Sequence, residues 1–432
     1  MHDKKGTTQD IIVLGAGASG MLCAATAAQN GRQVLLLEHN DAPGRKLAVT
    51  GGGKCNFSNR SVQPSDYVSE NKEFCRSALS RFGAAEAVKL VQSAGIDVEE
   101  RDHGQLFCQR SAKDLSAFLR RLCGTAGCAF AFGEKARRVE RCAQQNADSG
   151  ARFTVQTQSS TFFARSLVIA TGGPAWPQVG ATGTGFEVAR AMGHALVAPR
   201  PALAGLVMPE SWPLAGLAGI SAGASICVLP QENAAAQKDE QRNKNTQGKK
   251  RASPIPNPAA VNLPLLFTHR GISGPAALQA SLYWRSGMAL CIDFLPHISL
   301  EAQLDAPGAG KLACGSLVRR HMPERLALAL LPPELAKKPV ARLSREERNA
   351  LHAALCRFYV RPCATEGFSK AEVTAGGVST EHISSRSMQS ALAPGLFFCG
   401  EVLDVTGRLG GYNLHWAFAS ALAAGEALAH GS

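Results

Sequence analysis

The sequence predicts an α/β fold whose main domain is split by a β-rich insert, and three observations lead to this prediction. The chain begins with an apolar strand pattern, a glycine turn, a small-residue helix and a second strand. Strand patterns return at 166–170 and 395–399, and an Ala-rich helix pattern over 413–430 ends the chain. Short strand candidates separated by Gly and Pro fill the region between, which is typical of an inserted β domain.

The length of 432 residues exceeds one typical domain, so we expect two. Residues 1–198 form the first part of the main domain and residues 371–432 its C-terminal part. The insert, residues 199–370, has strand patterns at 225–229, 265–268 and 289–294, and a helical segment over about 324–359. Its basic loop, 231–258, carries six Lys and Arg against three acids. A solvated loop and a nucleic-acid-binding arm both fit this composition.

The first strand, Ile11–Leu14, runs into Gly15–Gly20, which matches G-x-G-x-x-G and opens a helix pattern over 21–29. The first glycine permits a tight turn, the second lets the backbone approach a pyrophosphate, and the third lets helix and strand pack closely. The second strand, Val34–Leu37, ends at Glu38, whose carboxylate suits a ribose and repels a 2′-phosphate. The pattern predicts a site for FAD or NAD rather than NADP.

Further glycine-rich segments favour FAD. Three consecutive glycines, 51–53, follow two basic residues and permit very close backbone approach to a flat or anionic group. Two later strand patterns end in glycines at 172–173 and in Gly-Glu at 400–401. The N-terminus of the last helix would stabilise negative charge on a reduced flavin. The predicted cofactor contacts are Gly15, Gly17, Ala18, Ser19, Gly20, Glu38, Arg45, Lys46, Gly51, Gly52, Gly53, Asn56, Thr171, Gly172, Gly400, Glu401, Asp404, Gly411, Tyr412 and Asn413.

Charge and cysteine content narrow the class of protein. Lys plus Arg minus Asp plus Glu is 46 − 34 = +12, a field that attracts polyanions such as nucleic acid. The thirteen cysteines form no Cys-x-x-Cys pair, so we predict no metal site and reduced thiols in a cytoplasmic protein. The apolar run 11–31 resembles a signal peptide, but its glycines and the strand that follows indicate fold. We expect no membrane segment, and the oligomeric state stays open.

Five motifs resemble the BaiN/RdsA family of NAD(P)/FAD-dependent oxidoreductases, some members of which have been called aminoacetone-oxidase-like. They are the glycine turn and the runs GGGKCNFSN from Gly51, ATGG from Ala170, LFTHRGISGP from Leu266 and GEVLDVTGRLGGYNLHWAF from Gly400. The resemblance covers essentially the whole chain. It implies a glutathione-reductase-type FAD-binding Rossmann domain, split by a β-rich insert. Lys54 and Cys399 depart from the family, which commonly has Arg and a small residue there.

The resemblance implies an FAD-dependent oxidoreductase that transfers hydride through flavin N5. The sequence contains no second G-x-G-x-x-G motif between a strand and a helix, so we expect no separate nicotinamide-binding domain. NAD(P)H would then act as a transient reductant. The resemblance also implies two substrate classes: a uridine of ribosomal RNA, reduced to dihydrouridine, or a small molecule. The positive charge favours the RNA substrate, because phosphate contacts need Lys and Arg. A small-molecule reductase or oxidase, and a basic RNA-binding or assembly protein with structural FAD, remain alternatives.

Protonation of the substrate would need a nearby acid. Cys55, His269 and His415 are candidates, although each also fits a buried or core role. Arg270 and Arg408 are candidate anion contacts.

Overall fold

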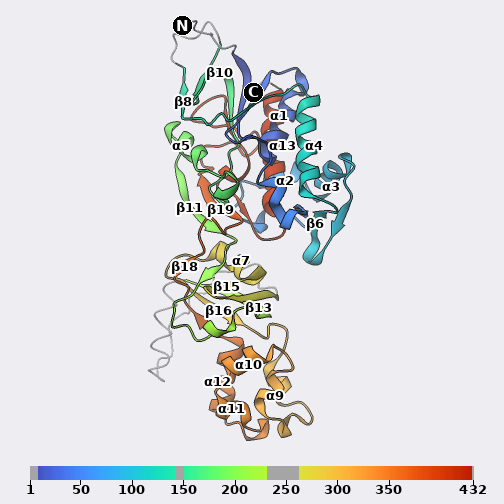
Figure 1. Cartoon of the computed structure of the whole chain (residues 1–432), viewed down its shortest axis with the longest axis vertical. Helices are drawn as coiled ribbons and strands as arrows, with labels where there is room; N and C mark the ends of the chain where they lie inside the picture. The colour runs from blue at the N-terminus through green and yellow to red at the C-terminus, as the bar shows by residue number, and fades with distance from the viewer. Residues whose placement is uncertain (1–7, 143–149, 231–261, 431–432) are drawn as a thin grey trace. The chain divides into compact units, whose positions relative to one another are not determined.

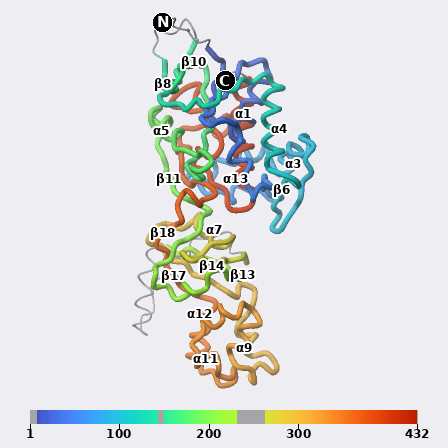
Figure 2. Tube along the Cα trace, viewed as in Figure 1, coloured from blue at the N-terminus to red at the C-terminus, as the bar shows by residue number. Residues whose placement is uncertain are grey.

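The computed structural model describes residues 8–142, 150–230 and 262–430. The predicted basic loop, 231–258, lies outside the described residues. The chain divides into two compact units, of which unit 1 comprises 1–201 with 372–432 and unit 2 comprises 202–371. Because unit 1 is built from both ends of the chain, residues far apart in sequence meet in it. Figure 2 shows the red C-terminal segment returning beside the blue N-terminal segment.

Unit 1 is organised around a parallel sheet with strands in the order β7-β2-β1-β10, with β20 also paired to β10. Leu14 lies opposite Leu37 and Ile169, so the carboxyl ends of three strands meet at one edge. The apolar runs of β1 and β2 are almost wholly buried, as a parallel sheet covered on both faces requires. The strands are β1 (Gln9–Leu14), β2 (Val34–Glu38), β7 (Ala129–Phe132), β10 (Thr161–Ile169) and β20 (Leu396–Phe398). Antiparallel strands β8 (Arg138–Arg141) and β9 (Phe153–Gln156) extend it.

The helices α1 (Ala18–Ala27) and α13 (Tyr412–Ala429) pack against each other beside this sheet (Figure 1). Small residues make the approach possible: a Cβ on Gly425 would lie 2.6 Å from the Cβ of Thr26. Helix α4 (Ala112–Thr125) packs on the other side of α1 and on the 3₁₀ segment η2 (Leu47–Gly53). The predicted strands of unit 1 and the terminal helix are present. Strand β10 begins at Thr161, five residues before its predicted start, and the other bounds of these elements agree within two residues.

The continuous helical pattern of residues 74–94 in the sequence forms two helices in the structure, α2 (Arg76–Arg81) and α3 (Ala84–Ser93). The break falls at Phe82, whose backbone is extended, and at Gly83, whose N–H donates to the carboxylate of Glu86 at 3.1 Å. This capping contact begins a new helix, which a continuous helical pattern does not reveal.

The rest of unit 1 consists of short elements. They are η1 (Ala28–Asn30), β3 (Asn56–Asn59), η3 (Pro64–Asp66), β4 (Tyr67–Val68), β5 (Val98–Glu100), η4 (Asp102–Gly104), β6 (Gln105–Cys108), η6 (Pro177–Val179), α5 (Thr184–Ala191), β11 (Leu196–Ala202), β19 (Val373–Val378), η10 (Gly400–Val402) and β21 (Thr406–Gly407).

Unit 2 contains a seven-stranded antiparallel sheet in the order β17-β16-β13-β14-β15-β12-β18, and a group of helices follows β16 in the chain. It has its own apolar core, which includes Phe267, Ile292 and Leu326. The helical segment is longer than the sequence predicts, because it begins at Leu300. The elements are β12 (Leu206–Val207), η7 (Ala215–Leu217), β13 (Ser221–Leu229), β14 (Leu263–Thr268), β15 (Gly271–Ser273), α7 (Gly274–Tyr283), β16 (Ala289–Asp293), α8 (Leu300–Leu304), η8 (Ala309–Lys311), α9 (Cys314–Val318), α10 (Glu324–Leu330), α11 (Pro333–Lys337), η9 (Val340–Arg342), α12 (Arg345–Cys356), β17 (Phe358–Val360) and β18 (Ala364–Thr365).

In the part of the chain that the structure describes, no helix combines the length and apolar character that a bilayer crossing requires.

Candidate functional site

The three glycines of the turn between β1 and α1 lie in different surroundings. Gly15 has a positive φ of 99°, and a Cβ there would lie 2.7 Å from the carbonyl oxygen of Ala170. A Cβ on Gly20 would collide with the carbonyl oxygen of Gly15. A Cβ on Gly17 would meet no protein atom within 4 Å. Gly15 and Gly20 are thus required by packing, whereas Gly17 leaves open space where a ligand can approach the backbone.

Helix α1 begins directly after Gly17, with Ala18 and Ser19 in its first turn. Its first N–H groups have no acceptor within the helix, and the helix dipole adds partial positive charge there. The open side of Gly17 therefore lies where an anionic group is favoured.

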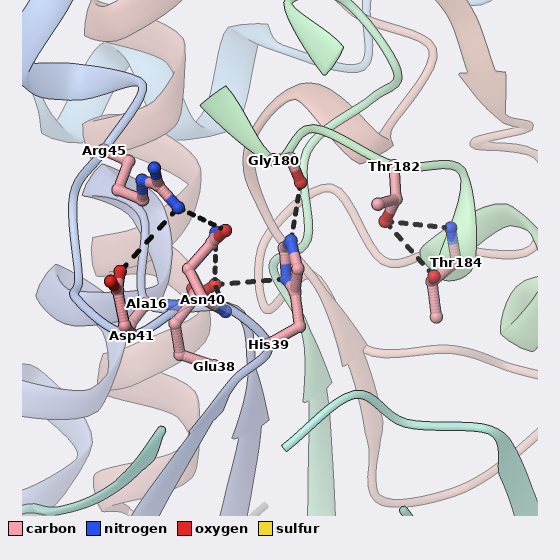
Figure 3. Close-up of polar contacts among 9 residues, drawn as sticks. All are labelled: Ala16, Glu38, His39, Asn40, Asp41, Arg45, Gly180, Thr182 and Thr184. Atoms are coloured by element: carbon pink, nitrogen blue, oxygen red, sulfur yellow. Dashed lines mark hydrogen bonds and ion pairs between the residues drawn. The ribbon is translucent and has the colours of Figure 1, made fainter. Parts of the chain in front are cut away.

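Glu38 ends β2 beside this turn and is held by several donors (Figure 3). One carboxylate oxygen accepts from the Ala16 N–H at 2.8 Å. The other accepts from the backbone and side chain of Asn40 at 2.9 and 2.8 Å, and lies 3.1 Å from His39 Nδ1. Burial alone would raise the Glu38 pKa, but the hydrogen bonds from His39, Asn40 and Ala16 outweigh it and lower the pKa. The side chain is therefore an anionic acceptor, as ribose binding requires.

His39 is a part of this cluster that the sequence prediction missed. Its Nε2 lies 2.6 Å from the carbonyl oxygen of Gly180, and its Nδ1 faces the Glu38 carboxylate. Both neighbours are acceptors, so the doubly protonated ring satisfies both of them and is the favoured form. The hydrogen bond with Glu38 raises the pKa of His39 accordingly. The only signal for His39 in the sequence was its position next to Glu38, the residue predicted to bind the ribose.

Arg45 and Lys46, two predicted cofactor contacts, are both engaged by protein groups. Arg45 donates to the side-chain oxygen of Asn40 at 3.1 Å, and Lys46 forms an ion pair with Glu401 at 2.7 Å. The second oxygen of Glu401 accepts from the Thr374 N–H at 2.9 Å. These contacts join the loop after β2 to the segment after β20, so they position that loop.

The glycine loop, residues 51–53, coils through three positive φ angles of 57°, 65° and 85°. A Cβ on Gly51 would lie 2.7 Å from the Asn56 nitrogen, but Cβ atoms on Gly52 and Gly53 would meet nothing within 4 Å. As at Gly17, two of these glycines present backbone to open space. Asn56 itself is bound internally when its amide oxygen is assigned to the side facing Gly411: it then accepts from the Gly411 N–H at 3.2 Å and donates to the carbonyls of Ser58 and Leu106.

The segment from Gly400 to Asn413 carries the remaining predicted contacts, and most of its polar groups are bonded to the protein. Gly400 donates to Ser420 Oγ at 2.9 Å, and a Cβ there would lie 2.5 Å from Ser19 Oγ. Asp404 accepts from the Glu70 N–H at 2.8 Å, and burial raises its pKa. Asn413 forms two hydrogen bonds of 2.8 Å with the Gly407 backbone.

Tyr412 begins α13, and its phenol accepts from Arg408 at 2.9 Å. Arg408 also pairs with Asp66 at 3.0 Å. The Gly411 N-cap has a positive φ of 96°, and a Cβ there would collide with the carbonyl oxygen of Ser58. We therefore interpret Tyr412, Asn413 and Arg408 as groups that shape the N-terminus of α13. Direct contact of Asp404, Tyr412 and Asn413 with a cofactor stays a prediction, as does the role of Arg408 as an anion contact.

Thr171 and Gly172 follow β10 at the same sheet edge. The Ala170 N–H donates to the Leu14 carbonyl at 2.9 Å, which places this segment beside the glycine turn. Gly172 has a positive φ of 68°.

The three candidate acids lie in different environments. His415 is fully buried, and its Nδ1 and Nε2 bond to Ser58 Oγ at 2.8 Å and to the Phe82 carbonyl at 3.0 Å. Burial lowers its pKa to about 4. The ring is neutral and occupied at both nitrogens, which favours the core role over the acid role. His269 lies in the exposed turn between β14 and β15 of unit 2, and its role stays a prediction.

Cys55 follows the glycine loop and has a positive φ of 53°, an uncommon conformation for a residue with a Cβ. Its carbonyl accepts from the Cys108 N–H at 3.2 Å, and both side chains are fully buried. A hydrogen bond with Cys108, together with burial, raises the pKa of Cys55 well above its ordinary value. The side chain is therefore a thiol that carries its proton at neutral pH.

A separate cleft of about 450 Å³ lies in unit 2, between β16 and α12. Its polar lining includes Asp293, His297, Glu301 and His352. Within the described residues, no group of three or more His, Cys, Asp or Glu side chains is arranged to hold a metal ion.

The parallel sheet, the open middle glycine and the anionic Glu38 define a dinucleotide-binding protein of the Rossmann class. The chain belongs to the HI0933-like protein Rossmann domain family, whose model matches residues 9–427. The α/β fold and the family resemblance inferred from the motifs are thereby confirmed.

The known proteins similar to this chain include two curated enzymes and one solved structure. The ribosomal RNA dihydrouridine synthase of Escherichia coli (strain K12) is 37% identical over 97% of this chain and 98% of its own length. A 3-dehydro-bile acid delta(4,6)-reductase of Clostridium scindens is 29% identical over 96% and 98%. The solved 3-ketosteroid-delta4-(5alpha)-dehydrogenase of Rhodococcus jostii RHA1 aligns over 99% and 98%, with 13% identity and a TM-score of 0.48.

Proposed function

We propose that this chain is an FAD-dependent oxidoreductase that reduces a uridine of ribosomal RNA to dihydrouridine. The observation that carries the cofactor is the combination of the open Gly17 backbone with the buried, anionic Glu38 at one sheet edge. The substrate is supported by the 37% identity to a ribosomal RNA dihydrouridine synthase over nearly the full length of both chains. The net charge of +12 suits a polyanionic substrate.

The residues present fit both the adenosine end and the flavin end of FAD. The first turn of α1 and the Gly17 backbone would hold the pyrophosphate, and Glu38 would accept the ribose hydroxyls. Gly52 and Gly53 leave room for a flat ring against the backbone. The first N–H groups of α13 have no acceptor within the helix, and they would favour negative charge beside a reduced flavin.

The overall reaction balances as NAD(P)H, a proton and uridine giving NAD(P)⁺ and dihydrouridine. Bound FAD supplies a two-electron carrier that passes hydride between the nicotinamide and the uracil. The protein must add a proton to the other carbon of the C5–C6 bond. The Cys55 thiol is our proposed donor, since it stays protonated and adjoins the glycine loop.

The first test follows the visible spectrum of the purified protein under anaerobic conditions. Flavin bands near ~450 nm should bleach when NADH or NADPH is added, and recover when ribosomal RNA from a strain lacking the enzyme is supplied. Mass spectrometry of the RNA should then show one uridine that has gained two hydrogen atoms. If the protein binds no FAD, the chain is not an FAD-dependent oxidoreductase and the proposal is wrong.

The Cys55 assignment is tested by separating the two half-reactions. Cys55→Ala should leave bleaching by the nicotinamide unchanged and slow recovery by RNA by about 10²-fold or more. Cys108→Ala is the matched control, because it removes the thiol's partner but keeps the proposed donor. Equal recovery rates in Cys55→Ala and the wild type would mean that the proton comes from another group.

A second candidate function is reduction of a carbon–carbon double bond in a small molecule, which the 29% identity to a 3-dehydro-bile acid delta(4,6)-reductase favours. Recovery of the bleached flavin by such a steroid, and not by RNA, would select it. An RNA-binding protein with structural FAD would instead bind RNA but show no bleaching with either nicotinamide. A ribosomal RNA substrate agrees with the predicted cytoplasmic location.

A further inference from the structure

Helix α4 has one apolar face and one basic face. Ala112, Leu115, Leu119 and Cys123 are buried against the unit 1 core. At about 100° per residue, Arg121 falls opposite this apolar face, whereas Lys113 and Arg120 fall along its side; all three are exposed. Arg110, also exposed, lies in the turn just before the Ser111 N-cap. We call these four residues the basic face of α4.

The charges of this face are not neutralised by the protein. Among the described residues, none of its four cations takes part in an ion pair, although cations elsewhere do, such as Arg348 with Asp305 at 2.8 Å. Its one exposed acid, Asp114, lies in the first helical turn, where it stabilises the helix dipole. The local balance is 4 − 1 = +3.

The basic face adjoins the candidate site through short connections. Ser116 of α4 lies against Gly44, and the Gly44 N–H donates to the Ala16 carbonyl in the glycine turn at 2.9 Å. Helix α4 also packs on η2, which contains the glycine loop. Arg110 is two residues past Cys108, whose N–H donates to Cys55. Exposed Lys54, next to Cys55, continues the positive charge toward the loop.

We propose that the basic face of α4 binds the phosphate backbone of the RNA substrate and directs the RNA toward the glycine loop. Unpaired cations on one helix face are the groups that RNA phosphates attract, and they carry no base specificity. The inference rests on the proposed function, since it names the surface that holds the same substrate.

The test compares two variants with equal charge change in the full-length, FAD-bound protein. The first replaces the basic face with Arg110→Gln, Lys113→Gln, Arg120→Gln and Arg121→Gln. Glutamine is a good helix former, so α4 should persist. The control replaces four exposed cations of unit 2, with Lys311→Gln, Lys337→Gln, Arg342→Gln and Arg345→Gln.

Affinity for ribosomal RNA would be measured by filter binding over a range of salt concentrations. We expect the basic-face variant to bind more than about tenfold more weakly, and its log K against log salt slope to flatten by about 3, at roughly 0.7 per lost phosphate contact. FAD content and bleaching by the nicotinamide should equal the wild type. The control should bind as the wild type does.

Two results overturn the inference alone, provided the wild type reduces uridine: wild-type affinity in the basic-face variant, or an equal loss in the control. In the second case, total charge rather than this surface would bind the RNA. A wild type that neither binds nor reduces ribosomal RNA overturns the proposed function and this inference together.

Discussion

Replacing Gly17 with Ala separates ligand contact from protein packing at the glycine turn. Gly17 has φ −78° and ψ −171°, a conformation that alanine adopts without strain. The added Cβ meets no protein atom within 4 Å. Any large effect of Gly17→Ala must therefore come from a bound ligand.

The expected magnitudes follow from these contacts. In the apo protein, reduced entropy of the unfolded chain favours Ala by about 0.4–1 kcal/mol, and loss of the preferred N-cap glycine offsets a similar amount. The free energy of unfolding should stay within about 1 kcal/mol of the wild type. In the complex, losing one hydrogen bond to a charged pyrophosphate costs about 1.5–3 kcal/mol, or about 10- to 150-fold in Kd.

The assay measures FAD affinity by fluorescence titration of the apo protein and stability by urea unfolding. Gly20→Ala is the contrasting variant: its Cβ would collide with the Gly15 carbonyl, so it should destabilise the apo protein itself by about 1–3 kcal/mol or more. An unchanged FAD Kd in Gly17→Ala would refute the reasoning, because the pyrophosphate could not then lie against Gly17.

Three further predictions concern groups around the site. Glu38→Gln should lower the raised pKa of His39, seen by NMR titration, because the Glu38 hydrogen bond is its main cause; an unchanged His39 titration would contradict this. In the wild type, the stabilisation from protonated His39 is present below pH 6.5 and lost as pH rises through its raised pKa. For His415 the sign is opposite: its lowered pKa makes the free energy of unfolding fall by about 3 kcal/mol as pH drops from 6.5 toward about 4. His415→Gln should remove that pH dependence from the urea-unfolding profile, and an unchanged profile would contradict it. Asn413→Ala should lower the free energy of unfolding by about 1–3 kcal/mol, because two hydrogen bonds to the Gly407 backbone are lost. A free energy of unfolding equal to that of the wild type would show that these two hydrogen bonds do not stabilise the fold.

The sequence alone determined the features that depend on neighbours along the chain. The strand, the glycine turn and helix α1 follow from a short apolar run, small residues and their spacing. Glu38 was predictable because it lies at the end of the second strand, where parallel strands present their carboxyl ends together. The same local logic erred at 82–83, where a capping contact interrupts the helical pattern.

The tertiary structure decided which polar groups remain free to act. Ser58 and Phe82, far from His415 in sequence, bury its ring and occupy both nitrogens. The Gly180 carbonyl gives His39 Nε2 a hydrogen-bond partner, and a hydrogen bond with Cys108 raises the pKa of Cys55. A residue type and its spacing indicate what chemistry a side chain can perform. Burial and hydrogen-bond partners set its charge and access, and these arise only when distant segments pack together.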